Sequence, residues 1–145
     1  MNMNTIPNWS EYYINMCDVI KTRSKDPSRQ VGACLVSIKD NRIISTGYNS
    51  LAAGANDNID WTNRQLVHSL VIHAETNVLL YSRSNFEESI LYCSTSPCKD
   101  CIKSIIASNV KKIIYKDDYK DIHEVKDICK FYNIELNKFR SDTLV

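Results

Sequence analysis

The alternation of short apolar runs with amphipathic stretches is the feature that most constrains how this chain can fold. Apolar residues at helical spacing, such as Tyr13, Cys17 and Ile20, predict helices. The expected helices cover residues 9–21, 73–81, a segment opening at Ser96-Pro97, and 122–132. Apolar and β-branched runs predict strands, which cover residues 31–38, 42–48, 89–94, 112–115 and 134–136. This order predicts an α/β fold in which helices cover both faces of a mixed sheet.

The segments between these elements carry signals of turns and loops. The turn at residues 39–41 makes the first two strands a hairpin. Asp26-Pro27 disfavours helix and predicts a loop over 22–30. Residues 49–63 carry Gly54 and no clear period, so we expect a long loop of the kind that is often functional. Ser96 is expected to cap the third helix, with Pro97 in its first turn.

Length, charge and hydropathy limit the broad class of the protein. The 145 residues fit a single domain over 1–145. Lys and Arg number 18 against 17 Asp and Glu, and this formal charge of +1 gives little support for a nucleic-acid polymer as partner. No apolar run reaches the roughly 20 residues of a membrane-spanning helix, and the polar residues 1–9 do not resemble a secretory signal. We therefore expect a cytoplasmic protein without membrane contact, whose six cysteines are reduced.

Two short motifs predict a metal centre. Cys98 and Cys101, spaced Cys-x-x-Cys at a helix start, can place two thiolates around one zinc ion. His73, at the start of the preceding helix, can supply a third ligand. Three protein ligands leave one position for a water molecule, whose pKa zinc lowers to about 7. The motifs therefore predict a catalytic zinc site rather than a closed structural one.

Glu75 gives this centre its expected chemistry. Two residues after His73, its carboxylate can lie near the water without coordinating the metal. It can take the proton of the water and pass protons to a ring nitrogen and a leaving amine. Attack of hydroxide on an amidine-like carbon, followed by loss of ammonia, is hydrolytic deamination. His-x-Glu together with Pro-Cys-x-x-Cys is the signature of zinc deaminases that act on cytosine or adenine.

Other interpretations of the cysteines remain open on the sequence. Cys98 and Cys101 could form a redox pair, although such motifs carry no His-x-Glu upstream. Cys93 could close a structural zinc site as a fourth ligand, although its place on a strand favours burial. Three further cysteines occupy apolar positions and are expected in the core: Cys17, Cys34 and Cys129. His68 and His123 lack ligand-like spacing and are expected to be ordinary histidines.

Five segments match a known family in order and spacing. They are Arg23-Ser24-Lys25-Asp26-Pro27, Gln30-Val31-Gly32-Ala33-Cys34, Gly47-Tyr48-Asn49, His73-Ala74-Glu75-Thr76-Asn77 and Ser96-Pro97-Cys98-Lys99-Asp100-Cys101. On these segments the chain resembles the deoxycytidylate deaminase family over nearly its whole length. The resemblance implies a cytidine deaminase-like fold, with a mixed five-stranded sheet as the middle of three α/β/α layers. It also implies a zinc-dependent hydrolase that releases ammonia from a deoxycytidine nucleotide.

The resemblance further implies the substrate and its contacts. The reaction would convert dCMP, and in one version also dCTP, to the deoxyuridine nucleotide and so supply thymidylate synthesis. Asn49 would bind the deoxyribose, and the backbone of Ala74 would hold the base oxygen. Ser24 and Lys25 would face the phosphate. Tyr119 resembles a family tyrosine that closes over the nucleotide.

Members of this family are commonly homohexamers that dCTP activates and dTTP inhibits, which implies an effector site here. Its expected residues are Tyr48, Ser50 and Gly54. Ser50 stands where the family has glycine and Ala52 where it has proline, which restricts one backbone position and loosens the loop. A triphosphate ligand could also bring Mg²⁺ as a cofactor in addition to the zinc ion.

Two other functions remain open on the sequence. A related enzyme could deaminate free nucleosides, bases or cytosines in a polynucleotide. The near-neutral charge and an aromatic content of 9% weaken the polynucleotide version. A non-enzymatic zinc module would instead have four protein ligands and release no ammonia.

Overall fold

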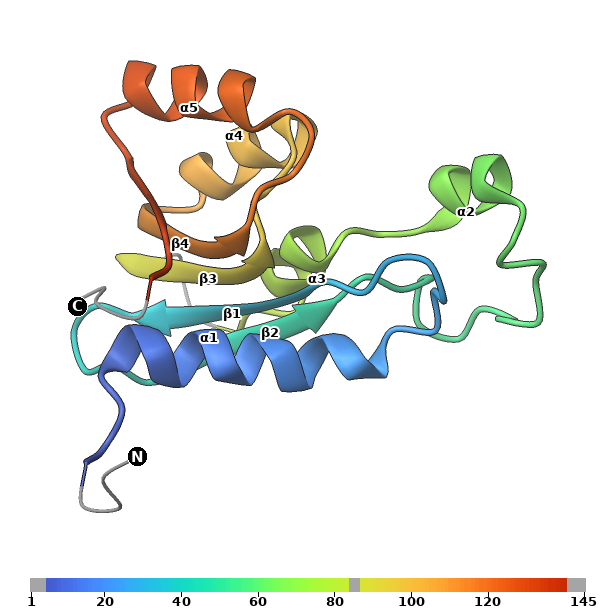
Figure 1. Ribbon diagram of the computed structural model, residues 1–145, viewed down its shortest axis with the longest axis horizontal. Coiled ribbons are helices and arrows are strands. Elements are labelled where there is room, and N and C mark those ends of the chain that lie inside the picture. Colours follow the sequence, from blue (N-terminus) through green and yellow to red (C-terminus); the bar gives the residue numbers. More distant parts are fainter. Residues whose placement is uncertain (1–4, 84–86, 141–145) are drawn as a thin grey trace.

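A five-stranded sheet forms the centre of the computed structural model, which describes residues 5–83 and 87–140 (Figure 1). The strands are β1 (Gly32–Ser37), β2 (Ile43–Tyr48), β3 (Ser89–Thr95), β4 (Val110–Asp117) and β5 (Glu135–Lys138). The helices are α1 (Trp9–Ile20), α2 (Arg64–Leu70), α3 (Ala74–Leu80), α4 (Lys99–Ala107) and α5 (Ile122–Phe131). A 3-10 helix over Lys21–Arg23 extends α1 into the loop expected from residue 22. Within this described part, no helix is both long and apolar enough to cross a membrane. The first four residues of the polar amino terminus lie outside it.

The strand order in the sheet is β2-β1-β3-β4-β5. β1 pairs antiparallel with both β2 and β3, whereas β3, β4 and β5 run parallel. The β1–β2 pair is the predicted hairpin, and α4 and α5 provide the crossovers that parallel neighbours require. The prediction of a mixed five-stranded sheet is confirmed.

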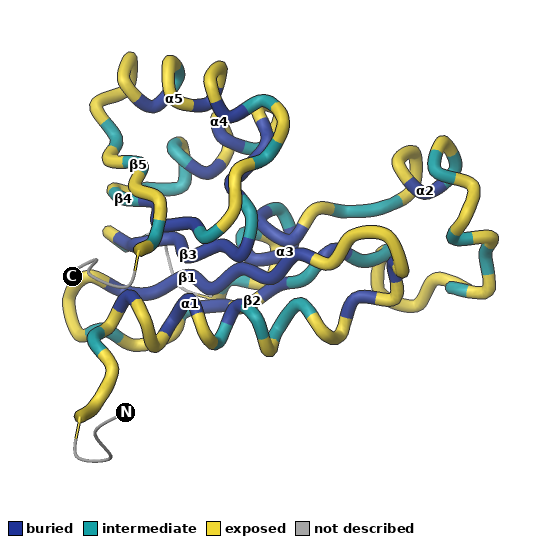
Figure 2. The backbone as a smooth tube through the Cα atoms, in the orientation of Figure 1, coloured by how far each residue is buried: buried dark blue, intermediate teal, exposed yellow. Residues whose placement is uncertain are grey.

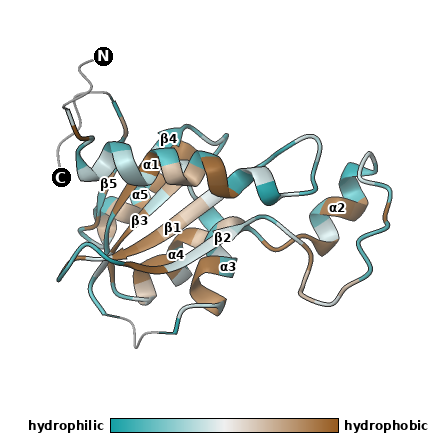
Figure 3. Ribbon diagram, turned by 90° about the horizontal axis from the view of Figure 1, so that it is seen from below, coloured by the Kyte–Doolittle hydropathy of each residue, from teal (hydrophilic) through white to brown (hydrophobic). Residues whose placement is uncertain are grey.

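Helices cover both faces of the sheet, as predicted. Because successive residues of a strand point to opposite faces, β1 serves two cores. Cys34 and Val36 pack with α1 residues such as Tyr13 on one face. Ala33 and Leu35 pack with residues of α3, α4 and α5 on the other face. Burial is concentrated along β1 and β3 in Figure 2, and Figure 3 shows apolar residues along the same strands. The three-layer α/β/α architecture is therefore confirmed.

The start of α4 differs from the prediction that Ser96 caps the helix and that Pro97 lies in its first turn. The helix begins after Cys98, which occupies the N-cap position. The backbone N–H of Ser96 donates to the Asp117 carbonyl at 2.9 Å, and its hydroxyl accepts the Tyr119 N–H at 2.7 Å. The hydroxyl is committed to the loop after β4 and does not cap the helix, so this prediction is wrong.

α2 is a helix that the sequence did not predict. It has one buried residue, Val67, and projects beyond the end of the sheet (Figure 1). Asn63 caps it by accepting the Leu66 N–H at 3.1 Å. The long loop expected over 49–63 precedes it. A β-bridge between Ser50 and Ile72 joins the two ends of this excursion, the segment 50–72 that contains the loop and α2. The excursion places α2 beside the site described next.

Candidate metal centre and adjoining cavities

Two helix N-termini bring the predicted metal ligands together. His73 occupies the N-cap position of α3, Cys98 that of α4, and Cys101 lies in the first turn of α4. Neither cap residue makes a side-chain capping hydrogen bond, so the imidazole and the sulfur remain available to each other. Gly47 in β2 permits the close approach of α3, because a Cβ there would lie 2.6 Å from the Ala74 carbonyl oxygen.

The three side chains form a compact set of donor atoms. His73 Nδ1 lies 3.4 Å from Cys98 Sγ and 3.3 Å from Cys101 Sγ. Zinc bonds of about 2.0–2.3 Å to nitrogen and sulfur place such atoms roughly 3.5 Å apart, so the set fits a zinc ion. Across the described residues, no other group of three or more His, Cys, Asp or Glu side chains brings its ligand atoms as close together.

Cys93 does not belong to this set. It is fully buried in β3, within the core that faces α3, α4 and α5. Burial also raises the pKa of its thiol. The prediction of a buried strand residue is confirmed, and the described residues do not form the closed site that Cys93 would have completed. The other cysteines expected in the core are buried too: Cys17, Cys34 and Cys129.

The ionisation of the three ligand side chains suits the binding of a cation. The pKa of Cys98 falls to about 4, because hydrogen bonds from Cys101 and His73 stabilise its thiolate. The pKa of Cys101 rises, because its thiol donates to Cys98 and is partly buried. The hydrogen bond with Cys98 raises the pKa of His73. A divalent cation would displace these protons, since thiolate and neutral imidazole are the forms that bind metal.

Glu75 lies in the first turn of α3, and its side chain is buried. Burial raises the pKa of its carboxyl to about 7. A carboxyl that titrates near neutrality can both accept and donate protons, as a general acid–base requires. A zinc ion, when bound, supplies a polarised water molecule with a pKa of about 7. Because Glu75 lines the same cavity as His73 and Cys98, it is placed to hold the proton that such chemistry moves.

This metal-centre cavity has a volume of about 200 Å³. Of the predicted nucleotide contacts, Asn49, Ala74 and Tyr119 line it. It is also lined by basic side chains that sequence reasoning missed as contacts: Arg29, Arg64, His68 and Lys120. Position is the one signal in the sequence for two of them, since Arg29 lies in an expected loop and Arg64 directly follows one.

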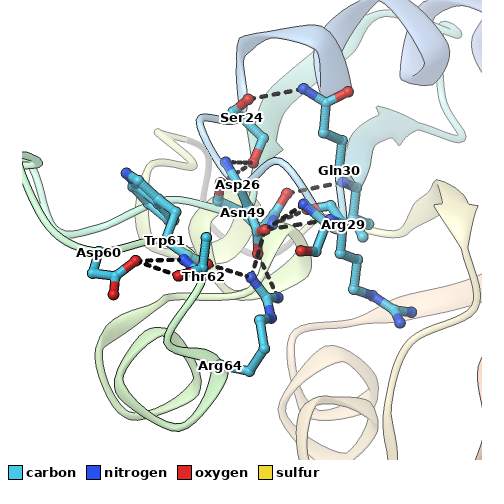
Figure 4. A network of polar contacts seen from close by, with 11 residues as sticks. Ser24, Asp26, Arg29, Gln30, Asn49, Asp60, Trp61, Thr62 and Arg64 are labelled. Atoms are coloured by element: carbon cyan, nitrogen blue, oxygen red, sulfur yellow. Dashed lines mark hydrogen bonds and ion pairs between the residues drawn. The ribbon is translucent and has the colours of Figure 1, made fainter.

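Asn49 ties the loop before β1 to the cavity wall (Figure 4). Its side-chain oxygen accepts the Val31 N–H at 2.8 Å, and its amide nitrogen donates to the Arg29 carbonyl at 2.8 Å. Ser24 is buried and donates its hydroxyl to the Asn49 carbonyl at 2.9 Å. Ser24 therefore supports the loop and is not among the residues that line the cavity.

An ion pair fixes the same loop against α2. Asp26 is 2% exposed, and its carboxylate oxygens accept from the two terminal nitrogens of Arg64 at 2.8 and 2.9 Å (Figure 4). The carboxylate also accepts the N–H groups of Ser28 and Arg29. Burial alone would raise the pKa of Asp26, but Arg64 and the backbone donors hold it below its usual value.

Lys25 lies on a different cavity. Its ammonium group pairs with Asp57, and both residues line a second cavity of about 400 Å³. The predicted effector residues Tyr48, Ser50 and Gly54 line this second cavity as well. The structure thus groups Lys25 with the predicted effector residues and not with the metal centre.

Comparisons with known proteins agree with this geometry. A family model described as "Cytidine and deoxycytidylate deaminase zinc-binding region" matches residues 7–117. The deoxycytidylate deaminase of Mus musculus is 35% identical over 142 residues, covering 90% of this chain and 79% of that protein. The deoxycytidylate deaminase of Homo sapiens is 32% identical over 140 residues, covering 91% and 78%. The crystal structure of dCMP deaminase from the cyanophage S-TIM5 in complex with dCMP and dUMP superimposes with a TM-score of 0.82 at 28% identity, covering 94% of this chain and 100% of that one.

Proposed function

Because this chain belongs to the cytidine and deoxycytidylate deaminase family and is a zinc-binding deaminase, we propose that it converts dCMP and water to dUMP and ammonia. The observation that carries the proposal is one constellation, in which His73, Cys98 and Cys101 form the metal set beside the buried Glu75. The named mammalian relatives, and the phage enzyme whose structure holds dCMP and dUMP, support the choice of nucleotide.

Glu75 is the catalytic residue of this proposal. Its carboxylate takes a proton from the attacking water and returns protons to the ring nitrogen and to the amine. The water oxygen bonds to the ring carbon, the C–N bond breaks, and the nitrogen leaves as ammonia. The backbone of Ala74 holds the base oxygen, Asn49 holds the deoxyribose and Tyr119 closes over the nucleotide. All three residues line the metal-centre cavity.

Ammonia release by the zinc-loaded protein from dCMP, dCTP and deoxycytidine tests this function. We expect dCMP to have the highest kcat/KM. Glu75→Gln removes the acid–base group but keeps its shape, so turnover should fall by about 10²–10⁴-fold while zinc content is retained. Glu11→Gln, an exposed change on α1, is the matched control and should keep full turnover.

Each result of this assay bears on a different claim. Full turnover in Glu75→Gln would overturn the role of Glu75. A clear preference for deoxycytidine would favour the nucleoside alternative, and a high rate on dCTP would make the triphosphate a second substrate. If none of the three compounds releases ammonia, the non-enzymatic zinc module is the interpretation that remains.

For the second cavity we propose a nucleoside triphosphate effector. Its lining combines Tyr48, Ser50 and Gly54 with Arg23, a cation suited to phosphate, and with Lys25, which would exchange Asp57 for the ligand. By family resemblance the activator would be dCTP with Mg²⁺, the inhibitor dTTP and the assembly a homohexamer. Initial rates on dCMP with each triphosphate, and the mass in solution, test this. Rates that neither triphosphate changes would overturn the effector site.

We also propose the cellular setting of this activity. The cysteines of the described residues are all free thiols, which suits the reducing cytoplasm. A single domain over 1–145 would supply dUMP there for thymidylate synthesis. Fractionation of cells that express the protein tests the location.

A further inference from the structure

We infer that Arg29, stacked on Tyr119, binds the 5′-phosphate of the substrate and makes deamination depend on that phosphate. This inference rests on the proposed function and assigns a specificity-determining residue to the metal-centre cavity. Three structural observations support it: the stack itself, the charge of the surrounding wall, and the way the Arg29 backbone is held.

The stack joins the loop before β1 to the loop after β4. The guanidinium carbon of Arg29 lies 4.0 Å from the centroid of the Tyr119 ring, in a cation–π contact. Lys120 approaches the same ring, with its Nζ 5.6 Å from the centroid. Since all three residues line the metal-centre cavity, two cations and an aromatic ring share one part of its wall.

These two cations are the positive charge that the wall offers to a ligand. The carboxylate of Asp26 already neutralises Arg64. Within the described residues, 5–83 and 87–140, neither Arg29 nor Lys120 forms an ion pair with a carboxylate. An anionic group that enters the cavity would therefore meet two cations that are not already committed to an ion pair.

The backbone of Arg29 is held on both sides, which preorganises its side chain. Its N–H donates to Asp26 at 3.3 Å, and its carbonyl accepts from the Asn49 amide at 2.8 Å. Figure 4 shows the side chain of Arg29 extending away from the pair that Asp26 forms with Arg64. A guanidinium held over a ring still carries N–H donors, and these can bind a phosphate with two parallel hydrogen bonds.

Lys25 lies on the second cavity and not on the metal-centre cavity. Its ammonium group pairs with Asp57 and lines the second cavity, whereas Arg29 lines the cavity that contains Glu75. Both basic residues belong to the same loop, but the structure directs only Arg29 toward the metal centre. Phosphate recognition is therefore assigned to Arg29.

Steady-state kinetics with dCMP and deoxycytidine test this assignment. Arg29→Gln should lower kcat/KM for dCMP by roughly 10–100-fold, mainly through KM, because a charge-assisted hydrogen-bonding partner is lost. The value for deoxycytidine, which has no phosphate, should stay unchanged. Arg29→Lys keeps the charge but loses the fork, so its loss should be intermediate. Lys130→Gln, which removes an exposed cation from α5 away from both cavities, is the matched control and should leave both substrates unaffected.

The ratio between the two substrates separates recognition from support of the fold. Equal losses on dCMP and deoxycytidine in Arg29→Gln would mean that Arg29 only supports the cavity, and would overturn the inference. So would a loss specific to dCMP in Lys25→Gln but not in Arg29→Gln. If the wild-type protein releases no ammonia from dCMP, the proposed function fails, and calorimetry with dUMP and deoxyuridine then decides the inference separately. It stands if Arg29→Gln weakens dUMP binding alone, and falls if both ligands bind the wild type equally.

Discussion

Replacing Asp26 by asparagine tests the ion pair that fixes the loop before β1. Asparagine keeps an oxygen that can accept the N–H groups of Ser28 and Arg29, but it removes the charge that faces Arg64. Removing one partner from a buried, hydrogen-bonded ion pair costs about 3–5 kcal/mol. The Arg64 side chain is 32% exposed, so water screens part of the loss and we expect about 2–3 kcal/mol. For a domain of this size the melting temperature should fall by roughly 4–12 °C.

The pH dependence of this variant follows from the pKa of Asp26. In the folded protein that pKa lies below its ordinary value, which is about 3.9 in an unfolded chain. The folded state therefore takes up the proton less readily than the unfolded state. The stabilisation is fully present above about pH 4 and is lost as the pH falls through the folded-state pKa. The difference in unfolding free energy between the wild type and Asp26→Asn should be constant from about pH 7 to 5 and should shrink below about pH 4.

Asp57→Asn is the matched control. It removes the same charge from the pair with Lys25, whose two side chains are 59% and 44% exposed. Exposed ion pairs contribute about 0–1 kcal/mol, so this variant should unfold almost like the wild type. Urea unfolding at several pH values measures both effects. Equal losses in the two variants would refute the argument from burial. A difference between Asp26→Asn and the wild type that widens in acid would refute the sign of the pKa argument.

Two further predictions concern the metal set and the approach of α3. Cys98→Ala and Cys101→Ala should each lose zinc, measured as metal content after dialysis, whereas Cys129→Ala in the core should retain it. Zinc retained by Cys98→Ala would contradict the ligand set. Gly47→Ala would place a Cβ 2.6 Å from a carbonyl oxygen of α3, so urea unfolding should show a loss of about 1–3 kcal/mol. The exposed change Thr46→Ala on the same strand should cost no more than about 0.5 kcal/mol. Equal unfolding free energies of the two variants would show that α3 can move away from the added Cβ without loss of stability.

The elements that could be predicted are those with a local apolar pattern. β1 and β3 carry continuous buried runs, and α1, α4 and α5 carry apolar residues at helical spacing. α2 was missed although Leu66, Val67 and Leu70 stand at helical spacing, because the helix has only 7 residues and only Val67 is buried. Ser96 fits the local rule for a helix cap, but its hydroxyl is taken by the Tyr119 N–H, which arrives from a distant loop. A local rule does not detect such a competitor.

The metal centre could be predicted for the same reason, since two short motifs at two helix starts carry the ligands. The cavity walls depend instead on pairs of loop residues that are far apart in the chain. Asp26 meets Arg64 across 38 positions, and Lys25 meets Asp57 across 32. A charged residue in a loop has no periodicity that identifies its partner. The sequence therefore indicated that basic residues were present but not which of them would reach the metal centre.

The segment Ser24-Lys25-Asp26 shows why neighbouring residues of one motif serve different sites. Lys25 lines the second cavity, and its neighbour Asp26 lines the metal-centre cavity. Residues 48–50 alternate in the same way, because Asn49 lines the metal-centre cavity and its two neighbours line the second. Joined by the hydrogen bond from Ser24 to Asn49, the two segments form a partition between the cavities. A substitution on either face of this partition therefore has to be assayed for substrate and for effector together.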